Sequence, residues 1–127
     1  MRLLAIGDDP ALHAQLRGSV AVRWLHSEVV EYDPVARGPL PQDICAQGFD
    51  AVVLDHAWCG ARGIDELTRL TARAGFAPVI FLGGRSGDDL CQAALNAGAC
   101  AAPGRTGTAP EALLAAISCA AQLQAGA

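Results

Sequence analysis

The sequence has few aromatic and basic residues and no long hydrophobic run. Aromatic side chains make up 5% of its 127 residues, and 13 acidic residues outnumber nine basic ones, which gives a net charge of −4. Because there is no block of basic residues, we expect no nucleic-acid binding by this chain. No apolar run approaches the roughly 20 residues that span a bilayer, so no membrane segment is expected. The start, MRLLAIGDD, lacks the pattern of a signal peptide, and we expect a cytoplasmic protein.

The cysteines exclude further kinds of site. No C-x-x-C motif occurs, and the odd set of five is widely spread over Cys45, Cys59, Cys91, Cys100 and Cys119. This pattern argues against a disulfide framework and against a structural zinc site. His56 and Cys59 lie close to Asp55 in the sequence, but nothing completes a tetrahedral set of transition-metal ligands around them. We interpret the other cysteines as small buried hydrophobic residues.

What the sequence does contain is an alternation of short apolar runs with helical patterns. With 52% hydrophobic residues, the chain is long enough for one domain with a real core. The predicted strands are 3–6, a segment within 23–32 that includes Val29 and Val30, 51–54, 78–82 and a short one at 100–103. Strands that alternate with helices indicate an α/β fold, with a parallel sheet and helices on both of its faces.

Capping residues and periodicity place the helices. The first helix is predicted to begin at Pro10, with Asp8 or Asp9 as its cap. Its apolar stripe consists of Leu12, Leu16 and Val20, at spacings of four. The segment 33–41 contains three prolines and a glycine and is predicted to be a loop.

The later helices follow the same kind of signals. A short helix is predicted over 42–47, and a longer one begins at Ile64 after the third strand. The next covers 86–96, with Ser86 as N-cap and Asp89 at the capping-box position. The last helix opens with the capping box Thr108-x-x-Glu111 and runs to about Leu123. There is no repeat and no internal domain boundary, so residues 1–124 form the domain and 125–127 begin a linker or tail.

Charged residues and glycines gather where the predicted strands end. In a parallel sheet this edge carries Asp8 and Asp9, Asp55, Gly83 and Gly84, and Arg105, and such an edge is where ligands bind in open α/β sheets. Carboxylate oxygens are preferred ligands of Mg²⁺, which keeps several waters and accepts phosphate oxygens. A remaining carboxylate can act as the nucleophile in phosphoryl transfer, and a metal and a cation can neutralise the transferred group.

The chain resembles the receiver domain of bacterial two-component response regulators over nearly its whole length. The resemblance rests on the acids after the first strand, on Asp55 at the end of the third strand and on Gly63 eight residues later. It rests also on the Pro78-Val79-Ile80 run, on the Gly98-Ala99 pair and on the capped final helix. It implies a flavodoxin-like three-layer sandwich whose five parallel strands have the order 2-1-3-4-5.

The same resemblance implies a function and a site. A receiver is a signalling module, not an enzyme, and it regulates an attached or separate output domain. Asp55 would be the phospho-acceptor for a histidine kinase or phosphotransfer protein. Mg²⁺ would be bound weakly by Asp8, by Asp55 and by the backbone carbonyl of Ala57. Asp9 would be a third acid at this site.

The sequence departs from the family pattern at four positions. The acidic pair after the first strand falls either on Gly7 and Asp8 or, with a shift of one residue, on Asp8 and Asp9. Gly83 replaces the hydroxyl residue at the end of strand four, and Arg105 replaces the family lysine. Ala102 stands where the family has an aromatic switch residue.

These departures leave two functions open. The first is a phosphorylation-dependent receiver. The second is a degenerate receiver that acts as a phosphorylation-independent dimerisation or docking module. A flavodoxin-like cofactor binder is disfavoured, because the nearest candidate for a phosphate-binding loop, 83–87, is more simply a flexible turn between a strand and a helix.

The last helix supports an interaction role. Its predicted buried stripe is Leu113, Leu114, Ile117 and Ala121. The predicted outward residues are small or uncharged: Ala112, Ala115, Ala116, Ser118, Cys119 and Gln122. Small residues let a second helix approach closely and an uncharged face is easily desolvated, so we expect a homodimer or docking of an output domain through this helix.

Overall fold

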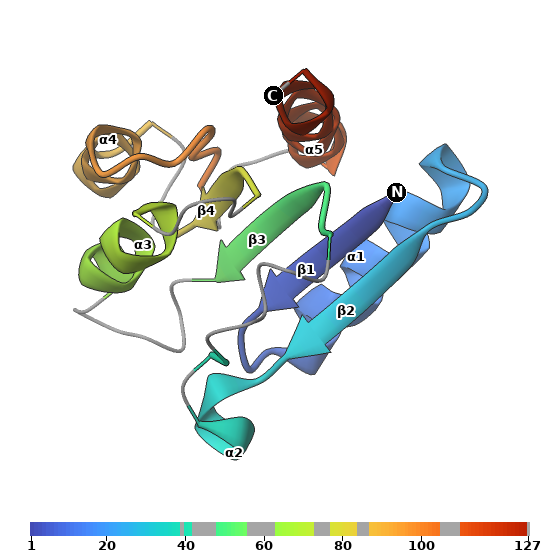
Figure 1. The fold of residues 1–127 in the computed structure, drawn as a ribbon, viewed down its shortest axis with the longest axis horizontal. Coiled ribbons are helices and arrows are strands. Elements are labelled where there is room, and N and C mark those ends of the chain that lie inside the picture. Colours follow the sequence, from blue (N-terminus) through green and yellow to red (C-terminus); the bar gives the residue numbers. More distant parts are fainter. Residues whose placement is uncertain are drawn as a thin grey trace.

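Four parallel strands form the centre of the molecule (Figure 1). The computed structural model describes residues 1–38, 40–41, 48–55, 63–72, 77–83, 87–104 and 110–126. The strands are β1 (Arg2–Ile6), β2 (Glu28–Tyr32), β3 (Ala51–Asp55) and β4 (Val79–Leu82). Their order in the sheet is β2-β1-β3-β4. The chain thus places β2 on one side of β1 and then adds β3 and β4 on the other side. The short β-branched and aliphatic runs seen in the sequence are the strands, as predicted.

Five helices are described, and they join or follow the strands. They are α1 (Pro10–Arg23), α2 (Pro34–Arg37), α3 (Gly63–Thr71), α4 (Asp89–Asn96) and α5 (Pro110–Ala125). The longest of them, α5, has 16 residues, and none combines the length and hydrophobicity needed to cross a membrane.

The sheet lies between two layers of helices, each with its own apolar core. Alternate strand residues point to opposite faces, and helices α1 and α5 cover one face while α3 and α4 cover the other. The α1/α5 side buries Leu3, Ala5, Leu16, Val20, Ala51, Val53, Ile80, Leu82, Ile117 and Ala120. The α3/α4 side buries larger side chains, Phe81, Leu67 and Leu70 among them. This is the three-layer α/β sandwich that the sequence predicted.

In the described residues 100–104, the fifth strand is represented by a single bridge. Ala101 pairs with Ile80 of β4 in the parallel direction. The backbone nitrogen of Cys100 donates to the carbonyl of Val79 at 2.9 Å, and that of Phe81 donates to the carbonyl of Ala101 at 3.0 Å. The segment therefore lies beside β4, where the predicted order 2-1-3-4-5 places the fifth strand. It forms a bridge at Ala101 and not the strand predicted over 100–103.

Two local predictions were wrong. The segment 33–41 is not wholly a loop, because Asp33 caps the one-turn helix α2 through the N–H groups of Val35 and Ala36. Helix α4 begins at Asp89 and not near Ser86, since the carboxylate of Asp88 accepts from the N–H of Cys91 and serves as N-cap. The short helix predicted over 42–47 falls outside the described residues, as does Thr108 of the second capping box.

Helix α1 differs from its predicted stripe at one position. Its buried residues are His13, Leu16 and Val20, whereas Leu12 is only half-buried against the core. The buried positions are thus spaced by three and then four, which is an equally regular helical stripe. The polar identity of His13 is what concealed it in the sequence.

The buried face of α5 also differs from the predicted one. Ile117 and Ala120 are buried, while Leu113 and Leu114 are half-buried and Ala121 is not part of the core. Of the residues predicted to face outward, Ala112, Ala115, Cys119 and Gln122 are exposed. Ala116 packs against the core and does not belong to the exposed face.

Candidate functional site

Asp55 is the residue around which the candidate site is built. It ends β3, one of the two central strands, and pairs in register with Leu82 of β4. Its exposed fraction is 1%, and it and His13 are the buried polar residues in the described part of the chain. A carboxylate at the carboxyl end of a central parallel strand lies at the edge where α/β sheets bind ligands. A carboxylate that is buried needs hydrogen bonds or an opposite charge to offset its loss of water.

Gly7 lies directly against Asp55. The register of β1 with β3 pairs Ile6 with Leu54, so the next residues on the two strands are Gly7 and Asp55. A Cβ atom built on Gly7 would lie 2.8 Å from the Cβ of Asp55 and 3.3 Å from its Oδ2. The N–H of Gly7 donates to the carbonyl of Tyr32 on β2 at 3.0 Å, which holds this end of β1 in the sheet.

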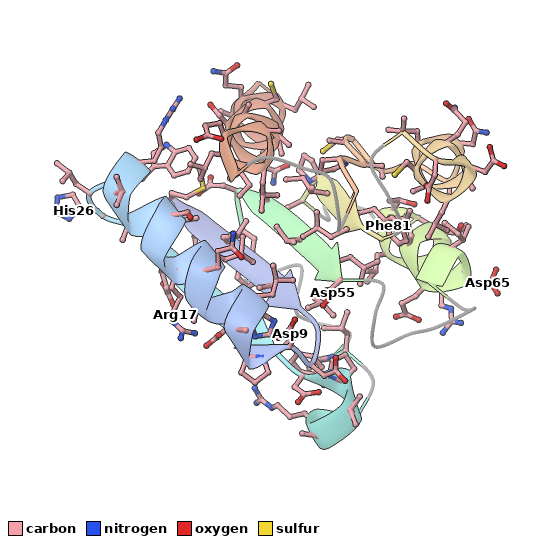
Figure 2. The ribbon with its side chains drawn as sticks, turned by 180° about the vertical axis from the view of Figure 1, so that it is seen from behind. Asp9, Arg17, His26, Asp55, Asp65 and Phe81 are labelled. Carbon is pink, nitrogen blue, oxygen red and sulfur yellow. The ribbon has the colours of Figure 1, made fainter. Side chains whose placement is uncertain are left out.

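The two acids after Gly7 have different surroundings. Asp8 is exposed. Asp9 caps α1, since its Oδ1 accepts from the backbone N–H groups of Ala11 at 3.0 Å and Leu12 at 3.4 Å. Figure 2 shows Asp9 at the start of α1 and Asp55 at the end of β3, on the same edge of the sheet. Asp8 therefore has the carboxylate that is not used for capping.

The other predicted site residues are described only in part. Gly83 directly follows β4, is buried, and its carbonyl accepts a weak hydrogen bond from the Sγ of Cys91 at 3.7 Å. It brings no hydroxyl group to this edge. Ala102, in the fifth-strand segment, is half-buried against the core. Ala57 and Arg105 lie outside the described residues, and their predicted roles stay predictions.

A metal ion at this edge of the sheet would have few carboxylate ligands. Within the described residues, no three His, Cys, Asp or Glu side chains come together in a way that could hold a metal ion. Mg²⁺ keeps several of its waters and is commonly bound through one or two carboxylates. Asp8 and Asp55 are the candidate carboxylates at this edge, and Asp9 is already used as a helix cap.

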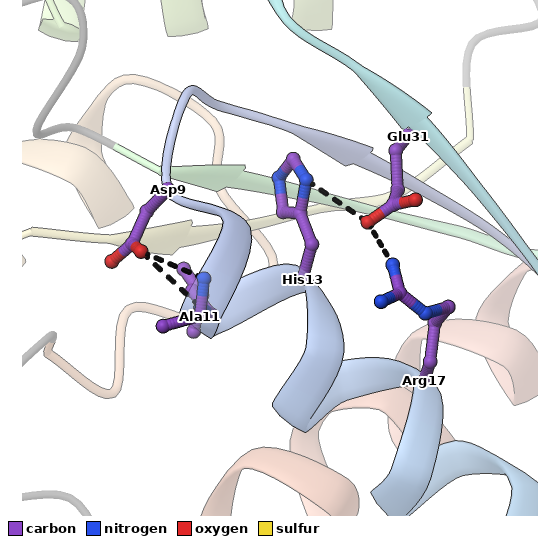
Figure 3. A network of polar contacts seen from close by, with 6 residues as sticks. Asp9, Ala11, His13, Arg17 and Glu31 are labelled. Carbon is purple, nitrogen blue, oxygen red and sulfur yellow. Dashed lines mark hydrogen bonds and ion pairs between the residues drawn. The ribbon is translucent and has the colours of Figure 1, made fainter.

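A polar network beside the site was missed by the sequence analysis. Nδ1 of His13 lies 3.2 Å from Oε1 of Glu31 on β2, and the same oxygen accepts from Nη1 of Arg17 (Figure 3). The other ring nitrogen of His13, Nε2, is buried and has no hydrogen-bond partner among the described residues. The available signal was the position of His13 three residues before Leu16, on the buried side of α1.

This network borders an open pocket of about 340 Å³. The pocket lies between the start of α1, the end of β2 and α2, and its lining carries both signs of charge. The lining residues are Gly7, Asp8, Pro10, His13, Arg17, Glu31, Asp33 and Arg37. Asp8 is thus shared between the edge of the pocket and the candidate site around Asp55.

Comparison with known proteins establishes the fold. No protein-family model and no curated protein matches the chain. Among solved structures, it is similar to the BeF₃-activated N-terminal receiver domain of RstA from Klebsiella pneumoniae, with 21% identity and a TM-score of 0.76 over 96% of this chain and 99% of that one. It is similar also to a CheY-like response regulator receiver domain from Methanospirillum hungatei JF-1, with 23% identity and a TM-score of 0.73 over 98% and 96%.

A third similar structure is a dimer. It is the beryllofluoride-activated NtrC4 receiver domain dimer, with 18% identity and a TM-score of 0.72 over 97% of this chain and 98% of that one. Each of these three matches covers nearly the whole length of this chain and of the solved structure. The chain therefore has the flavodoxin-like fold of response regulator receiver domains, as the sequence resemblance implied.

Proposed function

We propose that this chain is a receiver domain of a two-component signalling protein and accepts a phosphoryl group on Asp55 from a histidine kinase. The observation that carries the proposal is the position of Asp55. It is the buried acid among the described residues and lies at the carboxyl end of β3, in a chain that matches receiver domains over nearly its whole length. The phosphorylated domain would regulate an attached or separate output domain.

The transfer needs only a few groups. A carboxylate oxygen of Asp55 attacks the phosphorus of a phosphohistidine, and the phosphorus–nitrogen bond breaks as the new phosphorus–oxygen bond forms. The product is an acyl phosphate, and the leaving imidazole takes a proton from water. Asp8, Asp55 and the backbone carbonyl of Ala57 would hold Mg²⁺, and the bound ion would neutralise charge on the transferred group. Arg105 would add a further positive charge.

Two residues, Gly83 and Arg105, are expected to weaken the proposed site. Gly83 has no hydroxyl to donate to a phosphoryl oxygen, and a hydrogen bond to a charged group contributes roughly 1.5–3 kcal/mol. At Arg105, a guanidinium replaces the compact ammonium of lysine and differs from it in length and shape. We therefore expect phosphorylation of Asp55 to be slow.

Specific observations favour a second candidate function, a degenerate receiver that docks without phosphorylation. Asp55 is 1% exposed, and Gly83 lacks the hydroxyl group that the family pattern places at this edge. If the family's acidic pair falls on Gly7 and Asp8, Gly7 lacks a family side chain as well. The exposed residues Ala112, Ala115, Cys119 and Gln122 on α5 would serve either function, through a homodimer or through contact with an output domain. A dimeric receiver is among the similar structures.

Beryllofluoride separates the two functions. It is a tetrahedral analogue of a phosphoryl group, and ¹⁹F NMR distinguishes its bound from its free form. With Mg²⁺ present, the first function predicts a bound resonance in the unmodified protein. The resonance should be absent in Asp55→Asn and retained in Asp65→Asn, a matched change of an exposed acid on α3. A folded protein with no bound resonance at any beryllofluoride concentration would support the degenerate receiver instead.

A further inference from the structure

We propose that Gly7 is a positioning residue for Asp55, because its lack of a side chain lets the carboxyl group of Asp55 lie buried against the end of β1. The acceptor role of Asp55 rests on the proposed function, but its placement by Gly7 does not. The contact is between neighbouring strands at the centre of the sheet. It concerns the two residues that directly face each other where β1 and β3 end.

The need for glycine here is steric and not conformational. The described glycines with positive φ are Gly38, Gly48, Gly87, Gly98 and Gly104, and Gly7 is not among them. An alanine could therefore adopt the backbone conformation of residue 7. What it lacks is space, since its Cβ would lie 2.8 Å from the Cβ of Asp55.

The clash is hard to relieve. The nearest atom of Asp55 is its Cβ, which is fixed to the backbone of β3, and rotation of the side chain leaves that atom in place. The Oδ2 of Asp55 would also lie 3.3 Å from the added Cβ. Both residues are buried, and the N–H of Gly7 is bonded to the carbonyl of Tyr32. A side chain at position 7 therefore forces the ends of β1 and β3 apart and displaces the Asp55 carboxyl group from its buried place.

The placement has a consequence for chemistry at the site. The Cβ of Asp55 takes up the space that a Cβ at position 7 would need, and the carboxyl group of Asp55 lies in close contact with the same space. A carboxylate at position 7 and the observed position of Asp55 are thus mutually exclusive. The glycine is then coupled to Asp55, and an acid cannot be introduced at position 7 without moving Asp55.

Carboxyl labelling tests the placement without phosphorylation. The folded protein is treated with a water-soluble carbodiimide and glycine ethyl ester, and the labelling rate of Asp55 is followed by peptide mass spectrometry. We expect Gly7→Ala to label Asp55 several-fold faster than the unmodified protein. Gly18→Ala is the matched control, because a Cβ at that exposed helical position meets nothing within 4 Å. Unchanged Asp55 labelling in a folded Gly7→Ala protein would overturn the inference.

A double-mutant cycle tests the contact itself and remains informative if Gly7→Ala folds poorly. Gly7→Ala is expected to lower the melting temperature by about 4 °C or more, because the usual unfolding entropy of a domain of 127 residues converts a modest loss of stability into a shift of that size. Asp55→Gly removes the Cβ that clashes and should abolish most of that loss, whereas Asp55→Ala keeps the Cβ and should not. If the loss from Gly7→Ala is the same in the Asp55→Gly background, the two residues are not coupled and the inference is wrong.

Discussion

Oδ1 of Asp9 lies 3.0 Å from the backbone nitrogen of Ala11 and so caps the first turn of α1. The cap gives Asp9 a structural task at the N-terminus of the helix, where a negative charge is favourable. The neighbouring Asp8 is exposed and has no part in that cap. The two adjacent acids, which look equivalent in the sequence, are therefore expected to respond differently to substitution.

The first prediction concerns this cap. Asp9→Ala should lower the free energy of unfolding by about 1 kcal/mol, the usual cost of losing an N-cap side chain. Asp9→Ser keeps an acceptor oxygen and should recover most of the loss. Urea unfolding measures both, with Asp8→Ala as control. A loss as large in Asp8→Ala as in Asp9→Ala would show that capping does not distinguish the two residues.

Binding of Mg²⁺ should be weak, at about millimolar concentration or above, because Mg²⁺ gives up its waters reluctantly and few carboxylates are available. The fluorescence of Trp58, three residues from Asp55 in the sequence, can report binding in a Trp24→Phe background. Asp8→Asn and Asp55→Asn should each weaken binding further, and Asp65→Asn should not. Micromolar affinity would mean that an additional ligand takes part.

The buried ring of His13 should support the structure beside the site. His13→Ala removes a ring that is 7% exposed and leaves a cavity between α1 and β2, so we expect a loss of about 2 kcal/mol in the free energy of unfolding. His26→Ala, at an exposed position, should change it by less than about 0.5 kcal/mol. Equal effects of the two substitutions would remove the structural role assigned to His13.

The exposed face of α5 should mediate self-association without phosphorylation. No charged side chain follows Glu111 in the sequence, and Ala115 and Cys119 lie exposed on this helix. Sedimentation of the unphosphorylated domain should show a dimer that the pair Ala115→Arg and Cys119→Glu disrupts. Ala14→Arg, on the exposed side of α1, is the control. A strictly monomeric domain at high micromolar concentration would leave only docking of another protein to this face.

Much of the fold could be predicted from the sequence, because the sheet depends on a few strong local signals. The apolar runs at 3–6, 51–54 and 78–82 became β1, β3 and β4, each within one residue at either end. The fifth strand was harder to judge. Its length depends on pairing with one neighbour, and within the described part of this segment Ala101 alone forms a bridge.

The site was less predictable, because it depends on contacts between strands and helices. The position of Asp55 at the end of β3 followed from the pattern, but its contact with Gly7 required the register between β1 and β3. Whether Asp8 or Asp9 caps α1 could not be decided from composition, since both are good caps. His13 was missed because a buried polar residue becomes recognisable only when its partner, Glu31, is known.

The most direct test of the central proposal is phosphorylation by acetyl phosphate. The folded domain is incubated with Mg²⁺ and acetyl phosphate, and the intact mass is measured over time. We predict the slow gain of a single phosphoryl group, lost in Asp55→Asn and retained in Asp65→Asn. A phosphoryl adduct that survives Asp55→Asn, or a folded protein that never gains one, would contradict the assignment of Asp55 as the acceptor.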